Sequence, residues 1–149
     1  MKDITPRLIA LLRDGYCAPQ IARIAKKLKE PASTIHYNLK KLEKEGALKS
    51  CKAVFNYKKI GEGYCTYLLI RLSPEFYDKA EEVAAHLVRR EQVESADIVT
   101  GNYELLIKLR CRDSDEYYAL VQDIIKCHRL AKVMSMTSLK QFKTEFVAV

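Results

Sequence analysis

The stretch Glu30–Gly46, EPASTIHYNLKKLEKEG, decides how this chain is organised. Ser33 or Thr34 is expected to cap the start of a helix, because a hydroxyl oxygen can accept from the first unpaired N–H groups. Gly46 is expected to end the helix, since the left-handed backbone that often follows a helix suits glycine. The stretch therefore predicts one helix with defined ends.

This helix has two different faces. At about 100° per residue, Ile35, Leu39 and Leu42 share a narrow apolar stripe. The opposite side carries hydroxyl, aromatic and lysine side chains: Ser33, Tyr37, Lys40, Lys41 and Lys44. Such a face suits insertion into a DNA major groove, but an ordinary solvated surface helix would look similar. The surrounding sequence has to decide between the two interpretations.

Charge is distributed very unevenly. Residues 1–61 contain 14 Lys and Arg against 5 Asp and Glu, a net +9. Residues 62–149 contain 12 against 14, a net −2, and the two parts sum to the +7 of the whole chain. This asymmetry points to a first part that binds a polyanion and a second part with another role. The length of 149 residues allows one large domain or two small ones.

The five cysteines indicate a reducing compartment. Their number is odd, they are far apart and none forms a CxxC pair, so neither a disulfide framework nor a metal site is expected. We therefore expect a cytoplasmic protein with no metal and no cofactor. No run of about 18 apolar residues is present, so no membrane association is expected.

Two further helices precede the opening stretch. Apolar residues recur at helical spacing over 4–14, with Pro6 in the first turn, and again over 18–28. A short break before Glu30–Gly46 completes a helix-turn-helix pattern. Beyond Gly46, residues 48–55 predict two short strands, a wing whose lysines can reach phosphate. Residues 57–63 predict a linker.

The rest of the chain predicts a βαββαβ order. Strands are expected at 65–72, 93–100, 103–111 and 132–142, and helices at 73–90 and from Asp113 or Ser114 onward. Gly101-Asn102 predicts a tight turn between the middle strands. This order is typical of an α+β, ferredoxin-like antiparallel sheet with two helices on one face. The other face, with Tyr67, Leu69, Val99 and Leu106, is too apolar for water, so a homodimer packed sheet to sheet is expected.

The ordered set of motifs resembles the Lrp/AsnC (leucine-responsive, feast/famine) transcription regulators over nearly the whole chain. The motifs are Ser33-Thr34-Ile35, Lys40-Lys41-Leu42-Glu43, Glu45-Gly46, Leu48-Lys49, Ala53-Val54-Phe55-Asn56, Ile60-Gly61 and Thr100-Gly101-Asn102-Tyr103-Glu104-Leu105. Three features depart from the family pattern. Only Asp3 is present where the family often has paired aspartates in its first helix. Tyr37-Asn38 stands where an arginine pair is frequent, and Glu104 stands where Asp is usual.

The resemblance implies three parts: a winged helix-turn-helix domain at 1–55, a hinge at 56–63 and a RAM/ACT-like βαββαβ domain at 64–149 for oligomerisation and effector binding. The implied partners are double-stranded DNA, an amino-acid-like effector and further copies of the chain, as a dimer, tetramer or octamer. The effector contacts that it implies are Gly101, Asn102, Tyr103, Glu104 and Thr137.

Residue chemistry suggests how DNA would be contacted. The lysines expected to include the phosphate contacts are Lys26, Lys27, Lys40, Lys41, Lys44, Lys49 and Lys52. The residues expected to include base contacts are Ser33, Thr34, His36, Tyr37 and Asn38. Tyr37 and Lys40 are better placed than Asn38, which lies nearer the apolar flank.

Several alternatives remain open. Tyr37 could instead pack on the wing, and the Gly101 turn could be a plain hairpin with a surface glutamate. The protein could be an architectural DNA binder without an effector. Some tetrapyrrole-decarboxylating enzymes resemble this architecture, but no catalytic residues are recognised here, because the histidines are dispersed and no nucleophile–base pair stands out.

Overall fold

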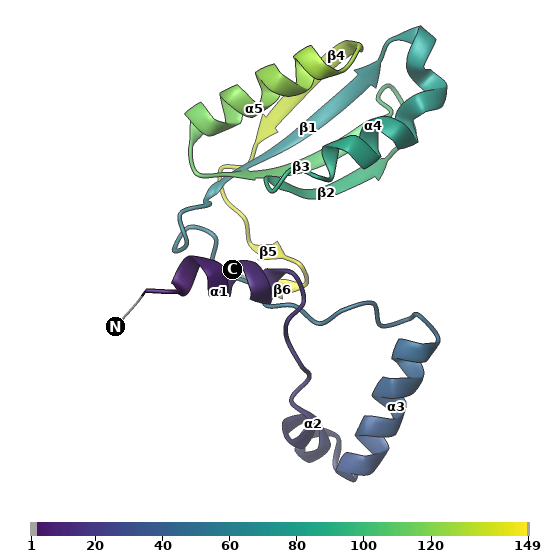
Figure 1. Ribbon diagram of the computed structural model, residues 1–149, viewed down its shortest axis with the longest axis vertical. Helices are drawn as coiled ribbons and strands as arrows, with labels where there is room; N and C mark the ends of the chain where they lie inside the picture. Colours follow the sequence, from purple (N-terminus) through teal and green to yellow (C-terminus); the bar gives the residue numbers. More distant parts are fainter. Residues whose placement is uncertain (1–2, 149) are drawn as a thin grey trace. The chain divides into compact units, whose positions relative to one another are not determined.

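The computed structural model describes residues 3–148 and divides between Val54 and Phe55 into two compact units. The first unit contains α1 (Thr5–Arg13), α2 (Ile21–Leu28) and α3 (Ala32–Lys44) (Figure 1). Pro6 lies in the first turn of α1, where its missing N–H costs nothing. The three predicted helices are therefore confirmed.

The start of α3 differs from the prediction, whereas its end agrees. Pro31 is the N-cap residue, with extended backbone, and its carbonyl accepts from Ile35 N–H at 3.2 Å. The helix thus begins at Ala32, before either hydroxyl residue, so the expected cap by Ser33 or Thr34 is wrong. Gly46 has φ +72°, as predicted for the residue that ends the helix.

The expected wing hairpin is also wrong. Residues 47–63, all of them described, contain no strand. Instead, Ala53 N–H donates to the Leu12 carbonyl at 3.0 Å, which satisfies one of the unpaired carbonyls at the end of α1. A two-stranded hairpin is marginal by itself, and this segment lacks an Asn-Gly type turn that would favour one.

The second unit contains a four-stranded antiparallel sheet with the order β2-β3-β1-β4. Its elements are β1 (Tyr64–Leu72), η1 (Pro74–Lys79), α4 (Ala80–Leu87), β2 (Val93–Ile98), β3 (Leu105–Cys111), α5 (Ser114–Cys127) and β4 (Leu130–Thr137). Both helices cover one face of the sheet (Figure 1). This is the predicted ferredoxin-like arrangement.

The core lies between this sheet and its two helices. Leu68 pairs with Ile107 and Ile70 with Leu105, so alternate residues of β1 and β3 point to the same covered face. Residues from both layers are buried: Leu68, Ile70, Leu72, Val83, Leu87, Leu105, Ile107, Leu109, Leu120 and Ile124. Ile125, expected to point inward, is 43% exposed, because it lies beside the buried stripe of α5.

Several element boundaries differ from those expected. The 73–90 helix begins with the 3₁₀ turn η1, in which Phe76 N–H donates to the Ser73 carbonyl at 2.8 Å. The Gly101-Asn102 turn is wider than a two-residue hairpin, because Val99 N–H donates to the Glu104 carbonyl at 2.9 Å. The last strand ends at Thr137 rather than at Phe142. β4 pairs only with β1, and Thr137 lies opposite Thr66, close to the start of β1 at Tyr64.

Beyond β4 the chain crosses the face that the helices leave open. It ends in a small hairpin of β5 (Lys143–Thr144) and β6 (Val147–Ala148). At the turn of this hairpin, Glu145 and Phe146 both have positive φ, of 48° and 65°.

The N-cap of α5 is Asp113, whose carboxylate accepts from Glu116 N–H at 2.9 Å. Asp113 is one of the two caps predicted for this helix.

Candidate functional site

The outward face of α3 presents the side chains expected at a DNA interface. Tyr37 is 70% exposed, and it lines a shallow surface hollow together with Lys40, Lys41 and Lys44. The other base-contact candidates on the helix, Ser33, Thr34 and His36, are exposed as well. Ile35 points the other way and is buried. Helical spacing alone separates these faces, as expected for an amphipathic helix.

Two lysines of α3 carry acidic partners on the same helix. Lys40 Nζ lies 2.9 Å from a Glu43 oxygen, and Lys41 Nζ lies 3.9 Å from a Glu45 oxygen. All four side chains are about half exposed or more. Because such surface pairs contribute roughly 0.3–0.5 kcal/mol, DNA phosphates could displace the carboxylates at little cost.

Asn38 and Tyr37 behave differently from one another. The Asn38 amide donates to the Thr34 carbonyl at 2.8 Å, so it is bound to its own helix. Tyr37 is too exposed to be packed on a wing. Lys49 and Lys52, from the segment that follows α3, are both exposed. The geometry favours Tyr37 and the α3 lysines over Asn38 as contacts to a duplex.

The connection between β2 and β3 is the loop expected to bind an effector. Gly101 has φ +117°, a conformation that L side chains rarely adopt. Gly101 and Asn102 are exposed, while Tyr103 is half-buried with its hydroxyl 3.6 Å from the Met134 sulfur. Lys132 Nζ lies 6.0 Å from the centre of the Tyr103 ring. The loop thus joins two exposed polar residues to an aromatic side chain near β4.

Glu104 is bound to the sheet rather than standing as a surface carboxylate. One of its carboxylate oxygens accepts from Leu72 N–H at 2.7 Å, and its own N–H donates to the Ile70 carbonyl at 3.0 Å. Glu104 is half-buried. Glu104 is therefore not a free surface carboxylate, and effector binding at this loop stays a prediction.

Thr137 does not join this loop within one chain. Thr137 pairs with Thr66, whereas the loop lies beside Leu72, six positions further along β1. At about 3.3 Å per residue, the two ends are roughly 20 Å apart. The structure brings Gly101, Asn102, Tyr103 and Glu104 together but leaves Thr137 at the opposite end of the sheet, where only a second chain could bring it to a shared site.

The uncovered sheet face is apolar in its middle. Tyr67, Leu69 and Leu106 are half-buried there, and Met134 and Met136 are 37% and 46% exposed. Val99, expected on the same face, lies instead in the β2–β3 loop. The register places Leu69 between Leu106 and Met134, so the apolar side chains are contiguous across three strands.

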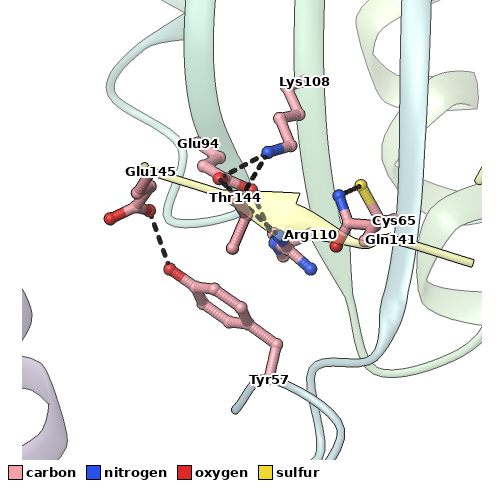
Figure 2. Close-up of polar contacts among 8 residues, drawn as sticks. All are labelled: Tyr57, Cys65, Glu94, Lys108, Arg110, Gln141, Thr144 and Glu145. Carbon is pink, nitrogen blue, oxygen red and sulfur yellow. Dashed lines mark hydrogen bonds and ion pairs between the residues drawn. The ribbon is translucent and has the colours of Figure 1, made fainter. Parts of the chain in front are cut away.

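One end of this face holds a buried polar cluster (Figure 2). Arg110, 6% exposed, donates to Glu94 at 2.5 Å, and Lys108 donates to the other oxygen of Glu94 at 2.8 Å. Lys108 also donates to the Thr144 hydroxyl at 3.1 Å, which ties β5 to the sheet. The Arg110 guanidinium lies 3.8 Å from the centre of the Tyr57 ring.

The same cluster holds the segment that leads into β1. The Tyr57 hydroxyl donates to Glu145 at 3.0 Å, and burial, followed by this bond, raises the pKa of Tyr57 to about 12. The sequence interpretation missed this cluster. Its only signal was a charged pair, Lys108 and Arg110, at alternate positions of an apolar strand.

The described residues contain neither a candidate metal site nor a helix that could span a membrane. Among residues 3–148, no group of three or more His, Cys, Asp or Glu side chains is arranged to hold a metal ion. Within that same range, no helix is long and apolar enough to cross a membrane. The five cysteines are all free thiols, with Cys65 and Cys111 buried.

A basic three-helix unit joined to a βαββαβ unit defines a class of helix-turn-helix transcription regulator. The chain belongs to the Lrp/AsnC family, because the family model of the Lrp/AsnC ligand binding domain matches residues 65–147. A curated HTH-type transcriptional regulator of Pyrococcus horikoshii is 32% identical over 146 residues, 97% of each chain. The HTH-type transcriptional regulator FL11 of Pyrococcus abyssi is 28% identical, covering 96% of this chain and 92% of FL11.

Solved structures share the fold. E. coli AsnC superposes with a TM-score of 0.70 at 24% identity, covering 99% of this chain and 98% of AsnC. The feast or famine regulatory protein of M. tuberculosis, in complex with L-methionine, gives a TM-score of 0.74 at 20% identity, covering 96% and 95%. The family predicted from the motifs is therefore confirmed.

Proposed function

We propose that this protein is a sequence-specific DNA-binding transcription regulator whose activity an amino-acid-like effector modulates. The observation that carries the proposal is the combination of two different parts in one chain. The first has a net charge of +9 and presents Tyr37 and lysines on the exposed face of α3, and the second, near neutral in charge, matches a ligand binding domain. Family membership and the names of the HTH-type relatives support it.

DNA contact would divide between two kinds of side chain. Lysine ammonium groups neutralise phosphates without sequence preference, and Tyr37 with the neighbouring hydroxyl groups would contact base edges. The lysines assigned to phosphate are Lys26, Lys27, Lys40, Lys41, Lys44, Lys49 and Lys52. The residues assigned to the groove are Ser33, Thr34, His36 and Tyr37, with Asn38 in a supporting role through its bond to Thr34.

A second copy of the chain would cover the open sheet face. The contiguous patch of Tyr67, Leu69, Leu106 and Met134 gives such a dimer its apolar centre. A twofold dimer would present two α3 helices to a roughly palindromic site. Higher assemblies would bring the Thr137 end of one sheet to the Gly101 loop of another, which completes the predicted effector set.

The effector would bind at the β2–β3 loop of residues 99–104. Exposed backbone N–H groups at Gly101 and Asn102 suit a carboxylate. Two family-fold structures, from M. tuberculosis and Neisseria meningitidis, contain L-methionine, which supports an amino acid as the class of ligand. Preferential binding to one assembly would shift the population of assemblies.

The experiment is a fluorescence-anisotropy titration of Lys40→Ala/Lys44→Ala against specific and random duplexes. We expect weaker binding and a shallower salt dependence, by a slope of about 1–2, because each lost phosphate contact removes roughly 0.9 from the slope. Arg89→Ala/Lys126→Ala, which removes the same charge from exposed positions of the second unit, is the matched control.

Size-exclusion chromatography should show the same oligomer for all three proteins. Equal affinity of wild type and Lys40→Ala/Lys44→Ala for the specific duplex would contradict the assignment of α3. Equal affinity of the wild type for specific and random duplexes at physiological salt would favour the architectural alternative.

A further inference from the structure

A cavity of about 350 Å³ lies within the second unit, on the side of the sheet that the helices cover. It is bounded by the end of β1, by η1 and α4, and by the connection between α5 and β4. The apolar residues of its lining are Phe76, which is half-buried, Val83, which is 8% exposed, and Leu72, which is fully buried. Its size falls within the range of pockets that hold small metabolites.

Two cationic side chains each lie within about 6 Å of the centre of the Phe76 ring. Lys79 Nζ lies 5.5 Å from the centre of the Phe76 ring, and the Arg129 guanidinium carbon lies 5.7 Å from it. Arg129 also faces Glu75 at 3.8 Å, but both side chains are about three-quarters exposed. Because so exposed a pair is weak, the guanidinium can exchange this partner for a ligand carboxylate.

A carboxylate completes the lining of the cavity. Glu82, from α4, faces the same space as Lys79 and Arg129. An apolar lining, a cationic pair and one carboxylate match the three parts of an apolar α-amino acid: its side chain, its carboxylate and its ammonium group. A ligand with only one of the two charges would leave either the cations or Glu82 without a counterpart.

The cavity is connected to the β2–β3 loop through one residue. Leu72 borders the cavity, and its backbone N–H donates to the Glu104 carboxylate at 2.7 Å. Next to it, Ser73 N–H donates to the Arg129 carbonyl at 3.2 Å. A ligand held by Arg129 would therefore act on both hydrogen bonds that anchor the end of β1.

We propose that this cavity binds an α-amino acid with an apolar side chain, at a position separate from the β2–β3 loop. Arg129 and Lys79 hold its carboxylate, Glu82 holds its ammonium group, and Phe76 and Val83 contact its side chain. Binding at this position stands independently of DNA recognition. Its regulatory consequence, through Leu72 and Glu104, rests on the proposed function.

Cys127 provides a direct reporter, because it lines the cavity and is exposed. The experiment measures the rate of its alkylation by iodoacetamide, by peptide mass spectrometry, with and without L-leucine or L-methionine. We expect alkylation to slow about tenfold at a ligand concentration ten times the dissociation constant. The half-buried Cys17 and Cys51 of the first unit serve as internal controls and should keep their rates.

Ligand analogues test the assignment of each charge. We expect no protection from 4-methylpentanoate, which lacks the ammonium group, from isopentylamine, which lacks the carboxylate, or from L-glutamate. Equal protection by either analogue would overturn the assignment of the charged groups. No protection by any amino acid at millimolar concentration would overturn the proposal.

Variants distinguish this cavity from the loop. Lys79→Gln/Arg129→Gln and, separately, Glu82→Gln should abolish protection of Cys127, while Arg89→Gln, outside the cavity lining, should retain it. Thermal melts confirm that each variant is folded. Loss of protection in Asn102→Ala together with its retention in both cavity variants would place the ligand at the loop instead.

The two proposals fail in different ways. If Cys127 is protected but no duplex is bound, the proposed function fails and the cavity stands. If DNA binding responds to amino acids while Cys127 is never protected, the cavity proposal fails and the proposed function stands.

Discussion

The carboxylate of Glu104 accepts a hydrogen bond from the backbone N–H of Leu72 at 2.7 Å. The side chain predicted to bind an effector ammonium group is thus also the anchor of the β2–β3 loop on β1. An effector that engages Glu104 would have to share or displace this bond. If the proposed effector binds there, stability and ligand binding are coupled at this residue.

The first prediction concerns that anchor. Glu104→Ala leaves the N–H of the buried Leu72 unpaired, which should lower the free energy of unfolding by about 1–3 kcal/mol. Urea denaturation measures the loss, and hydrogen exchange at the Leu72 amide should accelerate. Glu104→Gln keeps an acceptor and should lose less. Equal stability of wild type and Glu104→Ala would show that the bond contributes nothing.

The second prediction concerns the buried cluster around Arg110. Arg110→Met leaves Glu94 with Lys108 as its remaining cation, so the loss should lie near the lower end of about 3–5 kcal/mol. Limited proteolysis near Thr144 should then become faster, because that segment loses the bond from Arg110 and keeps the bond from Lys108. The matched control is Arg112→Met, whose side chain is 72% exposed and should cost less than about 1 kcal/mol.

Pairing Arg110→Met with Glu94→Met provides a further check. The loss in the double variant should be smaller than the sum of the two single losses, because the Arg110–Glu94 ion pair is removed in both single variants. If the two single losses simply add, Arg110 and Glu94 do not interact energetically.

The third prediction concerns the open sheet face. Leu106→Glu places a charge in the centre of the apolar patch, so it should convert the proposed dimer to a monomer in analytical ultracentrifugation. Ile125→Glu, on the exposed side of α5, is the matched control and should leave the dimer intact. A Leu106→Glu protein that stays dimeric would place the interface elsewhere.

The fourth prediction concerns pH. Burial, and then the neighbouring His86, lowers the pKa of His128 below 6.5. Because the folded state disfavours the protonated ring, the contribution of His128 to stability is present above pH 6.5 and is lost as pH falls through its folded-state pKa. The groups that face it are His86, Arg90 and Asp123.

His128→Gln should therefore flatten the dependence of the melting temperature on pH between about 7 and 5. His36→Gln, on the exposed face of α3, is the control for loss of a histidine. An unchanged pH profile in His128→Gln would contradict the assignment.

The local periodicity of the chain determined the order and type of most helices and strands. Helical and alternating apolar patterns are set by neighbours in the sequence, which is why the three N-terminal helices and the βαββαβ order could be predicted. The exposed face of α3 followed from the same periodicity. Local periodicity predicted a wing that the structure lacks. Ala53 N–H instead donates to the carbonyl of Leu12, which is distant in the sequence.

The sequence by itself determined the family, the difference in net charge between the two parts of the chain, and the lysine-rich face of α3. Motifs and charges depend only on which residues are present and in what order. Only the tertiary structure decided which residues share a site. It separated Thr137 from the Gly101 loop, because the antiparallel register places them at opposite ends of β1. It also brought Tyr57, Arg110 and Thr144 together, a contact between distant segments that no local pattern encodes.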